Sequence, residues 1–256
     1  FFVGDIVDSR VHYSRQTIAD VGREWGGPQT LGAPQLVIPV KGPETRKIRN
    51  EFTDPETGEN RVEWIDVTEM KPRNPVYLFP NVFDLAIDTT SEERSRGIFT
   101  VPVYRASAAI RFGFDTSEDA LGLKPDEVPQ WDRAALRISL TSNRALRGEA
   151  LLLAGDRPLT IEPFAGKGGG RSTGGITSET GDPRKVPEYD LKLEMNGAQQ
   201  LYLTPGGRTA RIVMRSDWPH PSFGGAFLPD DSEIGDNGFE ARWTIPHLAR
   251  SVPQVA

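Results

Sequence analysis

The residues most suited to chemistry lie in one proline-rich segment, Asp217–Gly225, which reads DWPHPSFGG. Its two prolines exclude a helix and a central strand, and they hold Trp218 and His220 in a stiff, extended path. His220 and Ser222 are two residues apart and share a face in extended backbone, so a serine nucleophile with a histidine base is conceivable. However, no G-x-S-x-G pattern surrounds Ser222, and no acid that would orient His220 is identifiable. We therefore favour a structural role for His220.

The aromatic residues of the same segment suggest a binding site as the alternative to catalysis. Trp218 and Phe223 could form a stacking platform for a sugar or a protein partner. They could also be buried anchors of a rigid corner, which is the more common role of aromatic residues beside prolines. We favour burial. If the segment does bind a ligand or partner, its contact residues are Trp218, His220 and Phe223.

Other charged or glycine-rich segments lack the spacing that chemistry requires. The run GKGGGRS at 166–172 has no glycine five residues before Gly166 and no Ser or Thr after Lys167, so it is not a phosphate loop. The acidic stretch Asp230–Asn237 lacks the spacing of a calcium loop. Nothing selects one pair among the 36 carboxylates as a glycosidase-like acid pair. With no cysteine and three scattered histidines, we expect no metal and no cofactor.

Composition indicates a turn-rich β protein that is large enough to bury a core. The chain has 256 residues, of which 37% are hydrophobic, and it contains 26 glycines and 21 prolines. Its net charge of −6 disfavours nucleic acid as a partner. The sequence contains no apolar run near the roughly 20 residues that span a bilayer, although Phe1–Val3 could be the end of such a span.

Alternation of apolar and polar residues is the strongest structural signal in the chain. It is longest at Tyr104–Asp115, and shorter runs predict strands at 35–40, 83–88, 134–141, 191–196, 201–204 and 210–215. Two hairpins are expected: 48–53 with 61–67, and 150–154 with 159–162. Lys71–Pro75 is interpreted as a break between strands. These patterns predict a mainly β fold, antiparallel and sandwich-like, with two related β units as a further possibility.

The remaining organisation follows from one helical stripe and one loop. Apolar residues at steps of three and four between Val7 and Trp25 predict an N-terminal helix, which Gly26-Gly27-Pro28 ends. The stripe would pack on its own domain or against a second chain. We expect a helix over residues 1–25 and a β domain over residues 26–256. The β domain has candidate sub-units 26–162 and 188–256, separated by a mobile loop at 163–187.

Several of these segments resemble the CreD family of bacterial inner-membrane proteins. The matching segments are Gly26–Val40 (GGPQTLGAPQLVIPV), Arg96–Tyr104 (RGIFTVPVY), Leu136–Gly148 (LRISLTSNRALRG), Ser216–Pro229 (SDWPHPSFGGAFLP) and Asn237–Trp243 (NGFEARW). They occur in the family's order and span almost the whole chain.

The resemblance implies a location and an architecture more than a reaction. It suggests the extracytoplasmic domain of an inner-membrane protein, on the periplasmic side, with residues 1–25 as a stalk after a missing membrane span. The partners would be the protein's own missing transmembrane helices and an envelope protein or glycan. We expect a non-enzymatic role in cell-envelope integrity, such as sensing, scaffolding or partner binding. The alternative is a carbohydrate-active β-sandwich enzyme or binding module that acts on envelope glycans.

Overall fold

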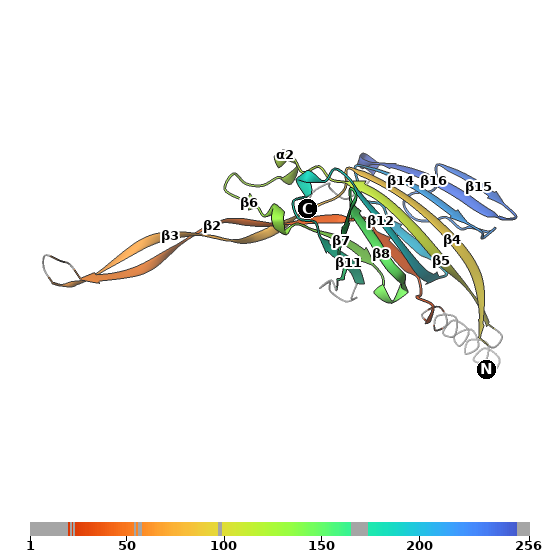
Figure 1. Ribbon diagram of the computed structural model, residues 1–256, viewed down its shortest axis with the longest axis horizontal. Coiled ribbons are helices and arrows are strands. Elements are labelled where there is room, and N and C mark those ends of the chain that lie inside the picture. Colours follow the sequence, from red (N-terminus) through yellow and green to blue (C-terminus); the bar gives the residue numbers. More distant parts are fainter. Residues whose placement is uncertain are drawn as a thin grey trace, which may run out of the picture.

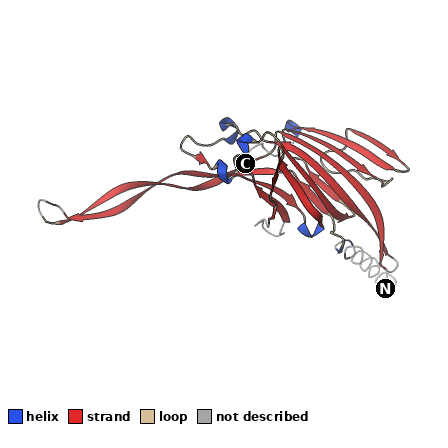
Figure 2. Ribbon diagram, viewed as in Figure 1, coloured by secondary structure: helices blue, strands red, loops and turns tan. Residues whose placement is uncertain are grey.

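Two β-sheets build the protein. The computed structural model describes residues 20, 22, 24–53, 55, 58–96, 99–164 and 174–249. The fold is mainly β, as the alternating patterns predict (Figure 2). The expected N-terminal helix over residues 1–25 lies almost entirely outside the described residues.

The first sheet, sheet A, has eight strands and carries a long hairpin. Its central path is β10-β11-β7-β1-β13, and β2 joins it by pairing with β7, β3 and β6. The strand bounds are β1 Gln29–Gly32, β2 Gln35–Thr53, β3 Asn60–Leu78, β6 Val128–Pro129, β7 Ala135–Leu140, β10 Glu162–Pro163, β11 Gly174–Glu179 and β13 Leu201–Thr204.

The second sheet, sheet B, also has eight strands, in the order β15-β16-β14-β4-β5-β12-β8-β9. Their bounds are β4 Val82–Arg96, β5 Phe99–Gly113, β8 Leu146–Ala154, β9 Arg157–Leu159, β12 Tyr189–Ala198, β14 Thr209–Ser216, β15 Asp231–Gly235 and β16 Gly238–Pro246. Short helical turns connect the strands: α2 Glu118–Leu121, η1 Trp131–Arg133, η2 Asn143–Ala145, η3 Pro183–Lys185 and η4 His247–Ala249.

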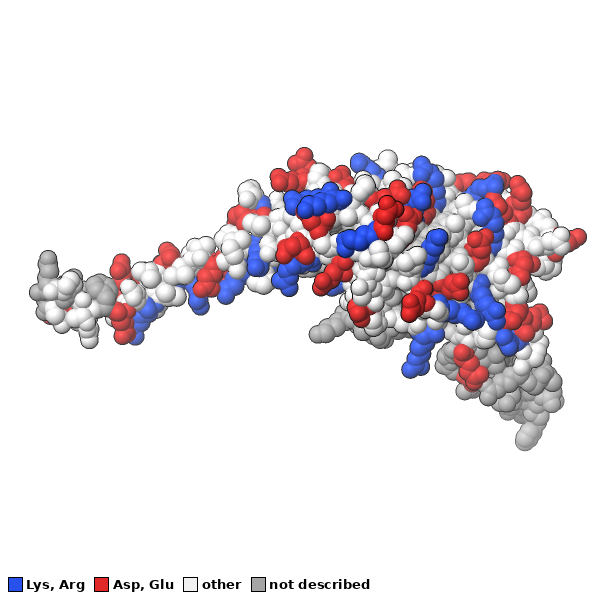
Figure 3. Space-filling view, in the orientation of Figure 1, with Lys and Arg blue, Asp and Glu red and all other residues white. Residues whose placement is uncertain are grey.

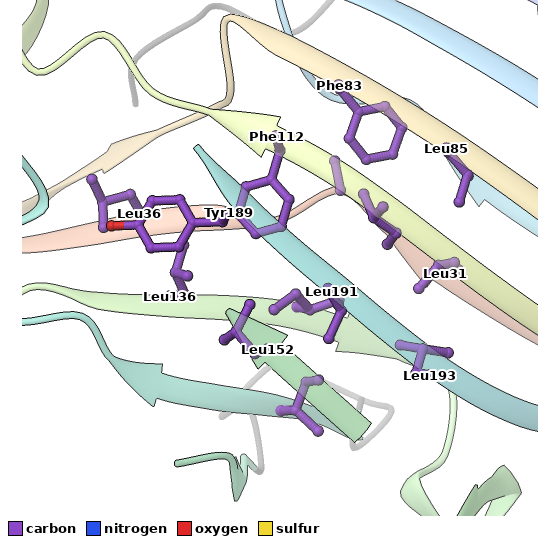
Figure 4. Packing of buried hydrophobic residues seen from close by; sticks show 14 of the residues in the cluster. Leu31, Leu36, Phe83, Leu85, Phe112, Leu136, Leu152, Tyr189, Leu191 and Leu193 are labelled. Carbon is purple, nitrogen blue, oxygen red and sulfur yellow. The ribbon is translucent and has the colours of Figure 1, made fainter. Parts of the chain in front are cut away.

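One hydrophobic core joins the two sheets. Leu36 and Leu136 from sheet A and Phe83 and Phe112 from sheet B belong to the same buried cluster (Figure 4). The rings of Phe112 and Tyr189 stack at 5.5 Å between centroids, with an interplanar angle of 14°. Because alternate residues of a strand point to opposite faces, the period-two pattern at 104–114 buries one face of β5 and leaves the other polar.

The chain passes repeatedly between the sheets, and both candidate sub-units contribute strands to each sheet. Sheet B takes β4, β5 and β8 from residues 26–162 and β12, β14 and β16 from residues 188–256. β13 runs parallel to β1 in sheet A, whereas β14 runs parallel to β4 in sheet B. The corner Pro205–Gly207 therefore moves the chain from one sheet to the other. Gly206 permits this crossing, because a Cβ there would lie 2.4 Å from the Cβ of Ala33.

Two sequence interpretations differ from the structure because both depended on local composition. The segment 163–187 contains β11, which pairs with β7 along its length. Its glycines suggested a loop, but a Cβ at Gly175 would lie 2.5 Å from the Ile138 carbonyl oxygen, so glycine is what allows the strands to meet. Lys71–Pro75 lies inside β3 rather than between strands. β3 is an edge strand here, where proline is tolerated.

The 48–53 and 61–67 hairpin is confirmed and is much longer than the sequence suggested. β2 and β3 have 19 residues each and pair almost from end to end. Beyond the body of the protein they continue as a two-stranded ribbon, which we call the arm: Lys41–Thr53 and Asn60–Arg73 (Figure 1). The pairing register shifts between Ile38 and Val40, beside Pro39, where the arm leaves the body. Such a bulge bends a strand and redirects it.

Candidate functional site

The proline-rich segment covers one end of sheet B. On the core-facing side of β16, the Phe223 ring packs edge-on against Phe239 and Trp243, with ring centroids at 5.4 Å and 5.6 Å. Phe239 is buried and pairs across the sheet with Ser216, the last residue of β14. Phe223 therefore anchors the corner to β16.

Trp218 and His220 lie together at the outside of the same corner. Trp218 is half-buried, and its indole Nε1 donates to the backbone carbonyl of His220 at 2.8 Å. The His220 side chain is exposed. Asp217 ties the corner to β4, since its carboxylate accepts hydrogen bonds from the Ser91 amide at 2.7 Å and the Ser91 hydroxyl at 2.6 Å. The structure thus brings Trp218 and His220 into contact, while Phe223 is held by different partners. A binding role for the three residues stays a prediction.

The face of sheet B that points away from the core is a regular array of paired charges. Arginines contact carboxylates of neighbouring strands, and Arg215 of β14 contacts carboxylates of both flanking strands, β4 and β16. Charges of both signs are interspersed on this part of the surface (Figure 3). The pairs are Arg111 with Asp190 and Glu188, Arg211 with Asp84, Arg215 with Asp88 and Glu240, and Arg242 with Asp231 and Glu240. Exposed pairs of this kind contribute little stability each.

The ion pairs also affect the acidity of Glu240. A hydrogen bond from Arg215 and the charge of the same residue hold the pKa of Glu240 below its usual range. A general acid needs the opposite shift, which burial away from positive charge would give. Glu240 is therefore suited to a charge-balanced surface, and not to general acid catalysis.

An open groove lies at the root of the arm. It has a volume of about 660 Å³ and is lined by Pro72–Val76 of β3, by the 121–124 segment and by Glu127. Glu127 is the one carboxylate in its lining, and its Oε2 accepts a hydrogen bond from the Lys124 amide at 3.1 Å. A single carboxylate cannot form the acid pair that glycoside hydrolysis requires. Across the described ranges, no cluster of three or more His, Asp or Glu residues could hold a metal ion.

The arm exposes several large apolar side chains. Val62, Trp64 and Met70 alternate along β3 and share one face of the ribbon, and each is exposed. Trp64 has 64% of its surface accessible. The opposite face carries Ile48 paired with Ile65, which are half-buried against each other. The sequence indicates this surface, because apolar residues occur at both even-numbered and odd-numbered positions of β3. A hairpin that lies on a core would have them on one face only, at alternate positions.

The arm also leaves backbone groups without strand partners. Along Thr45–Thr53 and Asn60–Met70, each strand pairs only with the other among the residues that the structure describes, so each has one open edge there. A two-stranded ribbon is marginally stable by itself in water, and an open edge with apolar residues is a template for another strand. An arm of this length with an exposed tryptophan is therefore a candidate interaction element.

The fold and the surface together define the class of protein. This is a two-sheet β domain whose prominent surface features are a projecting ribbon with an apolar stripe and a flat array of paired charges. Within the part of the chain that the structure describes, no helix is both long and apolar enough to cross a membrane.

Comparison with known proteins places the chain within a family. The sequence model described as "Inner membrane protein CreD" matches residues 1–256, so the chain belongs to the CreD family. It is 28% identical over 255 residues to the inner membrane protein CreD of Escherichia coli (strain K12). That alignment covers 98% of this chain and 52% of the relative, so the chain spans about half the length of the relative that it matches. The resemblance read from the sequence motifs is confirmed.

Proposed function

We propose that this domain is the partner-binding part of a CreD-family inner-membrane protein and that it works without catalysis of its own. The observation that carries the proposal is the arm, which holds Trp64 at 64% exposure on a ribbon whose two edges are open. Aromatic residues are the usual anchors of protein interfaces because they bury a large area with few rotatable bonds. The arm thus holds a contact residue away from the body, as a scaffolding role requires.

We further propose that the domain lies on the extracytoplasmic side of the inner membrane and contributes to envelope integrity. The family match and the half of the relative's length outside the alignment support a membrane protein with a large domain of this kind. A net charge of −6 and a surface of balanced ion pairs suit a domain in water. The groove at the root of the arm has one carboxylate in its lining, and the carboxylates of sheet B face arginines, so neither place favours the glycan-cleaving alternative.

Photo-crosslinking in cells tests the proposal. The whole membrane protein, expressed in its own host, would carry a photoreactive amino acid at Trp64 or, as the control, at Leu151. Leu151 is also an exposed apolar residue, but it lies on the charged face of sheet B. We expect a discrete protein adduct from position 64 and none from position 151. Equal labelling at both positions, or none at either, would contradict a binding role for the arm.

A loss-of-function measurement complements the crosslink. Cells carrying Trp64→Ala together with Val62→Thr should become as sensitive to detergent as cells that lack the protein, while the protein level stays unchanged. Leu151→Thr is the matched control and should leave detergent resistance intact. An arm variant with full resistance would argue against an envelope role that acts through the arm.

A further inference from the structure

We propose that the partner of the arm is a second copy of this chain, which adds its own β3 antiparallel to the β3 edge and makes a four-stranded sheet with the order β2-β3-β3-β2. This inference rests on the proposed binding function of the arm and names its partner. Four observations carry it: the position of the prolines, the direction of the backbone groups, the residue types on the two edges and the charges in the resulting register.

Prolines show which backbone groups point outward. In an antiparallel pair, residues alternate between those bonded to the partner strand and those whose N–H and C=O point away. Pro43 faces Met70, and Pro72 faces Lys41. Because proline has no N–H to donate to the partner strand, these positions belong to the second kind, whose backbone groups point away from the partner strand. We call these residues the outward set. Side chains are closer in that set, and the Thr45 and Thr68 hydroxyls, which face each other, are indeed 2.8 Å apart.

The outward set of β3 is the same set that exposes the apolar side chains. Every second residue from Asn60 to Met70 has its N–H and C=O directed outward, and this set includes Val62, Trp64 and Met70. The set also contains Asp66 and Thr68, so an incoming strand would gain backbone hydrogen bonds along the whole line and apolar contact at Val62, Trp64 and Met70. Pro72 closes the edge at the root of the arm, so the run open to pairing is Asn60–Met70.

The edge of β2 is protected by its composition. Its outward positions include Lys47, Arg49 and Glu51, and the proximal part of this edge is paired with β6 at Val40 and Lys41. Charged side chains on an edge, lysine above all, discourage addition of a strand. The β3 edge carries Trp64 and Val62 instead, so it is the edge that a second strand would use.

The register follows from twofold symmetry. The centre of the proline-free run Asn60–Met70 is residue 65, so Ile65 of the two copies would face each other across the axis. In this register Trp64 faces Asp66, Val62 faces Thr68 and Glu63 faces Val67, and no like charges are opposed. A shift of the axis by one residue to 66 places Asp66 against Asp66 and Glu63 against Glu69, which is unfavourable, and a shift to 64 leaves Glu69 and Met70 without partners inside the run.

The contact is large enough to hold two arms together. Each outward residue of the run would donate and accept one backbone hydrogen bond, which gives about a dozen bonds across the new edge. The two Trp64 side chains become diagonal neighbours at roughly 7–8 Å between Cα atoms, within reach of aromatic rings. The arm also gains a third and fourth strand, which an isolated ribbon needs for stability.

Single cysteines test the register, since the chain has no cysteine of its own. Facing residues of the closer kind lie about 4.5 Å apart at Cα, which suits a disulfide. We expect Ile65→Cys to oxidise to a covalent dimer. Val67→Cys and Glu63→Cys should each stay monomeric under denaturing electrophoresis, since each lies roughly 13 Å from its own copy. A mixture of the last two should cross-link to each other. Dimers from Val67→Cys alone, or none from Ile65→Cys, would overturn the proposal.

Two proline substitutions separate pairing from folding. The hydroxyls of Thr45 and Thr68 contact each other, so Thr45→Pro and Thr68→Pro each remove the same side-chain contact. Neither removes a backbone hydrogen bond between β2 and β3, because the N–H groups of both residues point outward. Only Thr68→Pro blocks the β3 edge. In sedimentation of the whole chain we expect Thr68→Pro to raise the dimer dissociation constant at least tenfold and Thr45→Pro to leave it near the parent value. Equal effects of the two changes would refute the edge assignment.

The outcomes of these tests also distinguish the inference from the proposed function. If Ile65→Cys fails to form a dimer and the photoreactive residue at 64 captures a different protein, the arm binds a partner but not its own copy. If position 64 captures nothing and no dimer forms, both proposals fail.

Discussion

Phe223→Ala is the substitution that best tests how the proline-rich corner is held. The ring of Phe223 is half-buried and lies edge-on against Phe239 and Trp243. Loss of about 100 Å² of buried apolar surface, roughly half of a large aromatic side chain, costs about 2.5 kcal/mol at 25 cal/mol per Å². Part of the energy of the two ring pairs adds to this, so we expect the free energy of unfolding to fall by about 3 kcal/mol.

Urea denaturation measures this loss, and His220→Ala is the matched control in the same corner. The bond from the Trp218 indole goes to the backbone carbonyl of His220, which alanine keeps. We therefore expect His220→Ala to stay within about 0.5 kcal/mol of the parent. Phe223→Leu keeps apolar area but loses the ring geometry and should fall between the two. If Phe223→Ala were as stable as the parent, the corner would not be anchored by this ring, and Phe223 would become a contact for an external partner.

Three further results are expected. Gly175→Ala should destabilise the domain by several kcal/mol, on the order of 3, because the new Cβ would lie 2.5 Å from the Ile138 oxygen; Gly224→Ala meets no atom within 4 Å and should change the urea midpoint little. Burial raises the pKa of the Tyr189 phenol to about 12, so stability present below pH 10 should decline as pH rises from about 10 to 12. Tyr189→Phe should make that decline smaller, while the half-buried Tyr104 phenol, whose pKa is also raised, keeps the rest. Hydrogen bonds from Arg184 lower the pKa of Asp182 to about 2, so its contribution should be full above about pH 4 and vanish as pH falls toward 2, a change that Asp182→Asn should abolish in acid titrations. A parent-like alkaline decline in Tyr189→Phe, or an unchanged acid limb in Asp182→Asn, would assign these effects to other groups.

The strands and the family could be predicted from the sequence because both depend on local pattern. Period-two alternation over 104–114 sets which residues of β5 are buried, whatever strands lie beside it. The hairpin at 48–53 and 61–67 needs only two matched strands and a short connection, and the structure confirms it. The motif around Asp217–Gly225, together with the other matching segments, was enough to indicate the CreD family, although not which of its aromatic residues would pack against the rings of β16.

Tertiary structure alone decided how the strands are shared and which surfaces stay open. Gly175 suggested a loop by composition, yet the close approach of β11 to β7 is what requires glycine there. Leu201–Thr204 and Thr209–Ser216 are close in sequence but join different sheets, because their partners β1 and β4 lie far away in the chain. Trp218 and Phe223 are both aromatic and stand beside the same prolines, but only Phe223 meets the rings of β16. The exposed Trp64 follows from the same cause: the sequence specifies a pair of strands, and only the packing of the whole chain leaves that pair outside the core.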